Sequence, residues 1–301
     1  MDYSEIKYQH INKIGTTDVE GLLNGTCYIY PKIDGTNCPI WFNEETNEIM
    51  VGSRTRVLSE DADNAGAYKT IHNDKRLQRF FKDYPNYILY TEFLVPHTIK
   101  TYEGTAWRNF YVFDIVDRDK TEHLPHYLTY EEYQPLMEQY ELLYIPLLKK
   151  IDNPTVEELQ ELTQINTYLI QENGGIGEGI VIKRYDFISK YGRREWGKIV
   201  ISEFGHKKHT PKVVPEDTIE KQIAAKYLTI EFIEKEYSKI YNEMNGWSSK
   251  YIGRLLSTIW YEFIRDYMCD ILKKYRNPTI DFRILQSSIN EIIKQTKTEL
   301  F

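Results

Sequence analysis

Residues 32–35 read Lys-Ile-Asp-Gly, and they follow a short apolar run that predicts a strand. A four-residue pattern with one free position arises often by chance, so alone it is weak. Four later segments in a fixed order give it weight: Tyr90–Glu92, Phe110–Asp114, Glu178–Lys183 and Lys198. Together they supply a lysine nucleophile, carboxylates, an aromatic side chain and further lysines. Transfer of a nucleotide to a lysine requires this set of groups.

Length and composition describe an ordinary globular chain. Its 301 residues, 41% hydrophobic and 28% charged, suffice for one large domain or two smaller ones. The three cysteines form no Cys-x-x-Cys pair, which argues against a zinc site or disulfide framework and fits a reducing cytoplasm. The sequence shows no signal peptide and no apolar run near the ~20 residues of a membrane helix. We therefore expect a soluble protein without a membrane partner, in the cytoplasm, or in the host cytoplasm if its source is viral.

The charge of the chain is unevenly distributed. A net charge of −7 taken alone counts against nucleic-acid binding, which depends on neutralising phosphates. Residues 190–212 nevertheless carry seven basic residues against two acidic ones: Lys190, Arg193, Arg194, Lys198, Lys207, Lys208 and Lys212 against Glu195 and Glu203. Two interpretations remain open, a solvated basic loop and the rim of a phosphate-lined groove.

Strand signals dominate before Pro215. Apolar and aromatic runs predict strands at residues 27–33, 39–43, 48–53, 87–94, 110–116, 179–185 and 197–201. Residues 44–47 would form a hairpin turn between the second and third of these. The set predicts one mostly antiparallel, two-layered sheet.

One helix is expected within this region. Asn153 is the predicted N-cap, Pro154 the first helical residue, and Asn173–Gly175 the end of the helix. Its buried stripe would consist of Val156, Leu159, Leu162 and Ile165.

After Pro215 the apolar residues recur at helical spacing. Helices are expected to open at Ile219, to run from Ile230 to Asn245-Gly246, to run from Ile252 to Asn277-Pro278, and to restart with Asp281 as a cap. The predicted class is therefore α+β. An antiparallel-sheet domain would occupy residues 1–214 and a small all-helical domain residues 215–301.

Three lysines lie at strand positions where they could share one site. A lysine nucleophile must be neutral to attack phosphorus, although its usual pKa is about 10.4, so burial or nearby cations must favour the neutral form. Lys32 ends an apolar strand, while Lys183 and Lys198 lie in two other predicted strands. If these strands are neighbours, the three ammonium groups could meet a triphosphate. Taken singly, each lysine is more often a snorkelling surface residue, and only their ordered combination favours a shared site.

The other candidate residues also have simpler explanations. Glu92 lies in an otherwise apolar strand, where a carboxylate is costly unless it is paired or functional. Glu178 lies between glycines that would let the backbone approach a ligand, or that would merely form a turn. Phe113 could stack on a purine or belong to the core. Asp114 could pair with a lysine or orient a water.

The ordered segments resemble the motifs of the covalent nucleotidyltransferases, which include ATP-dependent ligases and capping enzymes. Lys32–Asn37 resembles motif I, Gly52–Thr55 an arginine segment, Tyr90–Phe93 motif III, Phe110–Ile115 motif IIIa, Glu178–Lys183 motif IV, and Lys198–Ile201 motif V. Over residues 5–212 the chain most resembles the RNA ligase 2-like ligases of bacteriophages. Its helical tail also resembles that family, whereas DNA ligases and capping enzymes carry a β-barrel after motif V. The resemblance implies that residues 1–214 form an ATP-grasp-like adenylyltransferase domain.

The resemblance also implies a reaction. Lys32 would become adenylylated by ATP with magnesium, or with manganese as an alternative. The AMP would pass to a 5′-phosphate of RNA, and a 3′-hydroxyl would then displace it. This reaction would serve RNA repair. The RNA partner would be a nicked duplex or a broken strand, and the enzyme a monomer.

The roles implied for single residues follow the motifs. Phe113 would stack on adenine, Glu92 would hold the ribose hydroxyls, and Glu178 would bind the metal. The remaining nucleotide-binding residues would be Ile33, Asp34, Gly35, Asn37, Arg54, Lys183 and Lys198, with Lys183 and Lys198 on the α-phosphate. RNA contacts would come from Tyr8, Arg194, Lys207 and Lys208. The chain departs from the family's pattern at Val200, where a second motif V lysine usually stands.

Rival functions are a capping or DNA ligase-type nucleotidyltransferase, and an adenylylated RNA-end-binding protein without sealing activity. The helical tail argues against the first. The complete set of nucleophile and carboxylates argues against the second. A globular protein with motifs that match by chance is the remaining alternative.

Overall fold

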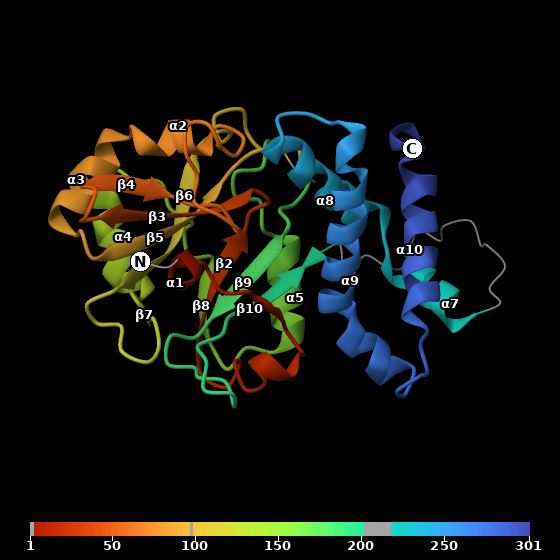
Figure 1. Cartoon of the computed structure of the whole chain (residues 1–301). Coiled ribbons are helices and arrows are strands. Elements are labelled where there is room, and N and C mark those ends of the chain that lie inside the picture. The colour runs from red at the N-terminus through yellow and green to blue at the C-terminus, as the bar shows by residue number, and fades with distance from the viewer. Residues whose placement is uncertain (1–2, 97–98, 202–217) are drawn as a thin grey trace. The chain divides into compact units, whose positions relative to one another are not determined.

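The computed structural model describes residues 3–96, 99–201 and 218–301 and divides the chain into two compact units, residues 1–204 and 205–301 (Figure 1). Each unit has a hydrophobic core of its own. The boundary expected at Pro215 lies outside the described residues, so the limits 1–214 and 215–301 stay a prediction.

The described part of the first unit contains ten strands and several helices. Its strands are β1 (Asn12–Lys13), β2 (Thr26–Lys32), β3 (Thr36–Asn43), β4 (Glu48–Val51), β5 (Tyr87–Phe93), β6 (Phe110–Asp117), β7 (His126–Tyr127), β8 (Lys149–Asp152), β9 (Gly179–Lys183) and β10 (Gly197–Val200). Its helices are α1 (Tyr3–Ile6), the 3₁₀ turn η1 (Thr17–Val19), α2 (Ala67–His72), α3 (Lys75–Asp83), α4 (Tyr130–Gln139) and α5 (Val156–Gln164).

The strands form two five-stranded sheets rather than the single sheet expected. The first sheet has the order β1-β10-β9-β2-β8 and the second β4-β3-β5-β6-β7. All pairs are antiparallel except β1 with β10. The prediction failed because β2 and β3 are consecutive yet do not pair. The turn at residues 33–35, directly after Lys32, carries the chain from the first sheet to the second.

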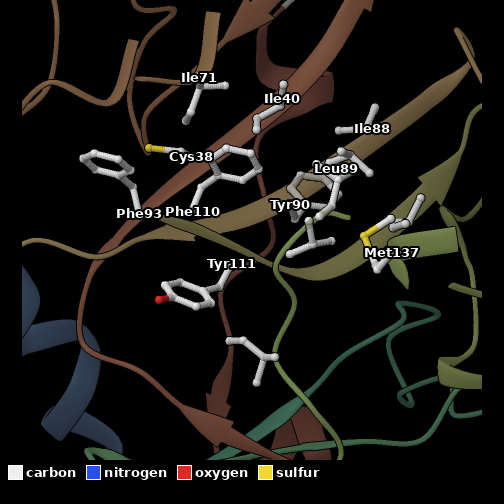
Figure 2. Close-up of a cluster of buried hydrophobic side chains, with 14 of the residues drawn as sticks. Cys38, Ile40, Ile71, Ile88, Leu89, Tyr90, Phe93, Phe110, Tyr111 and Met137 are labelled. Carbon is white, nitrogen blue, oxygen red and sulfur yellow. The ribbon is translucent and has the colours of Figure 1, made fainter. Parts of the chain in front are cut away.

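The two sheets share a core. Tyr28 and Tyr30 of β2 and Val181 of β9 belong to the same buried cluster as residues of the second sheet. Figure 2 shows the second sheet's contribution, in which Ile40, Leu89 and Phe110 lie among neighbouring apolar side chains. The opposite face of the first sheet is also covered. There the side chains Ile29, Ile180, Ile182 and Ile199 pack with Leu159 and Leu162 of α5. Alternation along the strands therefore separates two cores.

The helix α5 differs from its prediction at both ends. Thr155, not Asn153, is the N-cap, and it forms a capping box with Glu158. The helix ends at Gln164, well before Asn173. Ile165, expected in the buried stripe, is 66% exposed. The Asn166 side chain donates a hydrogen bond to the carbonyl of Gly179 at 2.7 Å. That contact fixes the chain to β9 and explains why the helical pattern stops there.

Short elements escaped the sequence analysis. The strands β1 and β7 have two residues each and β8 is largely exposed, so none carries an apolar pattern. The helices α2, α3 and α4 were also missed. In α3, Asp74 caps the start and Leu77, Phe80 and Phe81 are buried. Its nine residues are too few for a clear periodic signal.

The second unit is helical, as predicted. It contains α7 (Ile219–Tyr227), α8 (Ile230–Glu243), η2 (Ser249–Tyr251), α9 (Ile252–Lys274), α10 (Phe282–Thr296) and η3 (Thr298–Leu300). Asp281 is the N-cap of α10, since it accepts hydrogen bonds from the amides of Arg283 and Ile284. Buried residues of four helices, such as Ile223, Ile233, Phe263 and Ile289, form its core. Among the described residues, no helix has the length and apolarity to cross a membrane.

Candidate functional site

Lys32 lies at the end of β2, opposite Gly179 of β9. Its Nζ is 2.5 Å from Oε2 of Glu178, the residue that precedes Gly179. The Lys32 side chain is 20% exposed and that of Glu178 9%. The sheet thus places the expected nucleophile and the expected metal ligand in direct contact, although 146 residues separate them.

Two hydrogen bonds of Asp34, one from its backbone amide and one to its side chain, fix the turn after Lys32. The amide of Asp34 donates a hydrogen bond to the Tyr102 hydroxyl at 2.8 Å, and the carboxylate accepts one from the amide of Ile99 at 2.9 Å. Sequence reasoning missed Tyr102 and Ile99 because they lie in an irregular segment without a periodic pattern. Asp34 is buried, so in this structure its visible role is to fix the turn rather than to meet solvent.

Gly35 allows the turn to pass close to β5. A Cβ at this position would lie 2.6 Å from the carbonyl oxygen of Phe93, closer than any side chain can tolerate. The Gly35 amide donates a hydrogen bond to Oε1 of Glu92 at 3.1 Å. Asn37 pairs with Glu92 across β3 and β5, so the two side chains share one face of the second sheet. The turn therefore gathers residues of both sheets around Lys32.

The charges of Lys32, Glu178 and Asp34 affect the pKa of Glu92. Burial raises the pKa of Glu92 to about 7, the positive charge of Lys32 opposes this shift, and the negative charges of Glu178 and Asp34 add to it. Glu92 therefore changes charge near neutral pH. The ionised form is the stronger acceptor for hydroxyl groups.

This raised pKa predicts a pH-dependent stability. Between about pH 4.5 and 7 the folded state binds more protons at Glu92 than the unfolded state, so stability falls as the pH rises through that window. The slope is at most about 1.4 kcal/mol per pH unit. Glu92→Gln should remove this component. We expect the melting temperature of Glu92→Gln, relative to that of the wild type, to increase as the pH rises from 5 to 7.5. The exposed control Glu172→Gln should show no such relative increase. Parallel curves for Glu92→Gln and the wild type would contradict the assignment.

Lys198 and Val200 lie on the same face of the first sheet as Lys32. Lys198 pairs with Val181, which in turn pairs with Tyr30. Val200 pairs with Gly179, which in turn pairs with Lys32. A row here means residues that pair directly across neighbouring strands. Val200 is therefore in the row of Lys32, and Lys198 is in the adjacent row on the same face. Lys198 is half-buried and Val200 is buried.

Phe113 and Asp114 owe their orientation to a β-bulge. Thr91 pairs with Val112 and Tyr90 with Asp114, so Phe113 is an extra residue in β6. Such a bulge lets two consecutive side chains point the same way. Both indeed meet the same neighbours. The Tyr8 hydroxyl donates to Asp114, and the Tyr8 ring lies 4.9 Å from that of Phe113.

Lys183 lies in the core and not beside Lys32. It pairs with Tyr28, four residues before Lys32 along β2. Its Nζ is 2.7 Å from Oδ1 of Asp114 and donates to the carbonyl of Phe113 at 2.6 Å. Burial lowers the pKa of Lys183 and raises that of Asp114, while their mutual attraction opposes both shifts.

The remaining expected site residues are dispersed. Arg54 is exposed in the loop after β4, and Tyr8 is half-buried between Phe113 and Tyr90. Arg194 is half-buried, and burial lowers the pKa of its guanidinium. Lys207 and Lys208 lie outside the described residues. The nucleotide contact expected of Arg54 and the RNA contacts expected of Tyr8, Arg194, Lys207 and Lys208 stay predictions.

A divalent cation fits the chemistry of the Lys32 site. Among the described residues no group of three or more His, Cys, Asp or Glu side chains forms a dedicated metal cage. Magnesium usually takes only one or two carboxylates together with substrate phosphates and water. Glu178, directly before β9, is the carboxylate in contact with Lys32, and the negative charge of Glu92 lies within its electrostatic range. Glu178 would hold the ion, and Glu92 would add negative charge nearby.

Comparison with known proteins identifies relatives of this fold. The sequence profile of the RNA ligase family matches residues 25–200, more than half of the chain. No curated protein matches the chain significantly. Two solved structures of Naegleria gruberi RNA ligase variants, both with ATP and Mn, align at 22% identity. Their TM-scores are 0.50 and 0.51, with 66% and 67% of this chain covered. The aligned parts span 57% and 59% of those ligases, so the likeness concerns the fold of a part of each.

Proposed function

The chain belongs to the RNA ligase family, and we propose that it joins RNA ends with ATP through a covalent lysyl-AMP intermediate. The observation that carries the proposal is the contact of Lys32 with Glu178 at the point where both sheets meet the turn of residues 33–35. The solved ligases with a similar fold were determined with ATP and Mn, which supports the same nucleotide and a divalent metal here.

The first step would form a bond between Lys32 Nζ and the α-phosphorus of ATP. The bond from that phosphorus to the bridging oxygen breaks, pyrophosphate leaves, and the amine loses a proton. Glu178 contacts the amine and can receive this proton or hold it in position. A bound divalent cation supplies positive charge that offsets the charge developing on the phosphates.

The neighbouring residues would bind and orient the nucleotide. Glu92, on the same face as Asn37, would accept hydrogen bonds from the ribose. Lys198 would offset charge on the α-phosphate from the adjacent row of the first sheet. Val200 stands in the row of Lys32 where a second lysine would otherwise lie. Lys198 would therefore be the motif V lysine that offsets the phosphate charge.

Two later steps would complete the reaction. A 5′-phosphate oxygen of RNA attacks the AMP phosphorus and the bond to Lys32 breaks. A 3′-hydroxyl then attacks the activated 5′-phosphate, and AMP leaves. The substrate would be a nicked duplex or a broken RNA strand, the role RNA repair, and the acting form a monomer. A bacteriophage RNA ligase 2-like subtype is the proposal for its place within the family.

Intact mass of the purified protein tests this proposal. We expect a gain of one AMP after incubation with ATP and magnesium or manganese, and its loss after pyrophosphate is added. An adduct with GTP alone would favour a capping-type enzyme. An adduct with ATP but no sealing of any RNA would favour an RNA-end-binding protein. Absence of an adduct with every nucleotide and metal would overturn the proposal.

A further inference from the structure

A charged pair in the core of the first unit is not used by the chemistry above. Asp114 of β6 and Lys183 of β9 are 0% and 1% exposed. Their 2.7 Å contact joins the second sheet to the first. A buried ion pair of this kind contributes little net stability, because desolvation of both charges offsets their attraction. The effect of the pair on the position of neighbouring side chains is therefore of more interest than its effect on the free energy of unfolding.

The contacts of the pair converge on Phe113. Lys183 Nζ donates to the Phe113 carbonyl at 2.6 Å. It also lies 5.6 Å from the centre of the Phe113 ring and 4.6 Å from that of Tyr30. Asp114 accepts the Tyr8 hydroxyl, and the Tyr8 ring packs edge-on against Phe113. Two of the network's three polar groups thus touch Phe113 directly.

Phe113 needs such support because of the bulge. The extra residue of a bulge is left out of the strand ladder, so its backbone groups must find other partners. Here Lys183 is the partner of its carbonyl. Tyr30 is two residues from Lys32 and lies on the same face of β2. Because the Lys183 ammonium lies over the Tyr30 ring, this ring connects Lys183 to the strand that carries Lys32. The network therefore fixes one aromatic side chain with respect to the sheet that carries the nucleophile.

We propose that Lys183, with Asp114 and Tyr8, is a set of positioning residues that hold Phe113 for contact with the nucleotide base. In this proposal Lys183 does not contact the α-phosphate, in contrast to the role expected from the sequence. The inference rests on the proposed function, since it presumes that ATP binds next to Lys32 and that its base reaches Phe113, as the family motif implies. It predicts that disruption of the network weakens recognition of the base more than the chemical step.

The test replaces the whole network by apolar groups. In Tyr8→Phe/Asp114→Leu/Lys183→Met both charges and the hydroxyl are removed together, so no charge is left buried without a partner and the fold should survive. The Phe113 carbonyl and the Trp196 indole lose their bonds to Lys183 and Asp114. The rate of AMP attachment is measured against the concentration of ATP and of CTP. We expect the half-saturating ATP concentration to rise about tenfold, as expected when part of a base–aromatic contact is lost. The maximal rate should fall less than that, and the preference for ATP over CTP should narrow.

Lys198→Met is the matched comparison, because it removes a lysine from the same face of the first sheet. It should lower the maximal rate and leave the preference for ATP over CTP unchanged. A triple variant that behaves like Lys198→Met would overturn the positioning role and return Lys183 to the phosphate. So would a triple variant with unchanged half-saturation and unchanged base preference.

A milder variant keeps the inference testable if the triple variant does not fold. Tyr8→Phe retains the ring and removes only the hydroxyl that donates to Asp114. It should shift ATP half-saturation and base preference in the same direction by a smaller factor, and identical values to the wild type would count against the network. A wild type that forms no adduct would instead refute the proposed function, so the two failures are distinguishable.

Discussion

Lys32→Ala is expected to abolish attachment of AMP, with the fold left intact. Lys32 Nζ is the only atom in this site proposed to form a bond with phosphorus, so its removal lowers the rate by several orders of magnitude. The side chain lies at the end of β2 and is 20% exposed, so its loss leaves no large cavity. Its ion-pair partner Glu178 has a side chain that is 9% exposed.

Intact mass and circular dichroism together check this prediction. The matched control is Lys149→Ala, which removes an exposed lysine from β8, the other neighbour of β2 in the same sheet. The control should form the adduct at the rate of the wild type. An undiminished adduct in Lys32→Ala would show that another residue is the nucleophile and would remove the main support for the proposed chemistry.

Removal of residues 216–301 is expected to spare self-adenylylation and to slow the sealing of nicked RNA by about tenfold or more, or about 1.4 kcal/mol of transition-state stabilisation. All the described residues assigned to the nucleotide lie in the first unit, between Lys32 and Lys198. The second unit has a separate core, so the first should fold without it. The helical unit is then left with a task in handling RNA.

The sealing defect can be assigned to a step. The truncated and full proteins are compared for AMP attachment, for transfer of AMP to a 5′-phosphate, and for sealing of an RNA that already carries the activated end. A defect confined to the last two assays supports an RNA-handling role for the helical unit. Equal sealing by both proteins would exclude that role, and loss of AMP attachment would show that the first unit depends on the second.

The site was accessible to sequence reasoning where its residues follow regular strands. Lys32 and Glu178 were selected from separate motifs, and the register of β2 with β9 brings them together. Glu92 was selected as a carboxylate in an apolar strand, and burial there raises its pKa. The register also shows that Val200 occupies the row of Lys32, a consequence that motif spacing alone did not reveal.

Other parts of the site depended on irregular structure. The β-bulge at Phe113 turns Asp114 towards Lys183, and no local pattern in residues 110–117 signals an extra residue. Lys183 had been expected on the phosphate, and the structure instead places its ammonium between two sheets. Tyr102 reaches Asp34 from an irregular segment that carries no strand or helix signal.

The sequence by itself determined the α+β class, the helical character of residues 218–301 and the order of the motifs that mark the RNA ligase family. These properties rest on local periodicity and on short motifs, which a chain carries in any state. Only the tertiary structure decided that β2 and β3 enter different sheets, that α5 ends at Gln164, and that Lys183 joins the sheets. These outcomes depend on which strands pair and on how buried polar groups find partners, and both are settled by contacts between residues far apart in the chain.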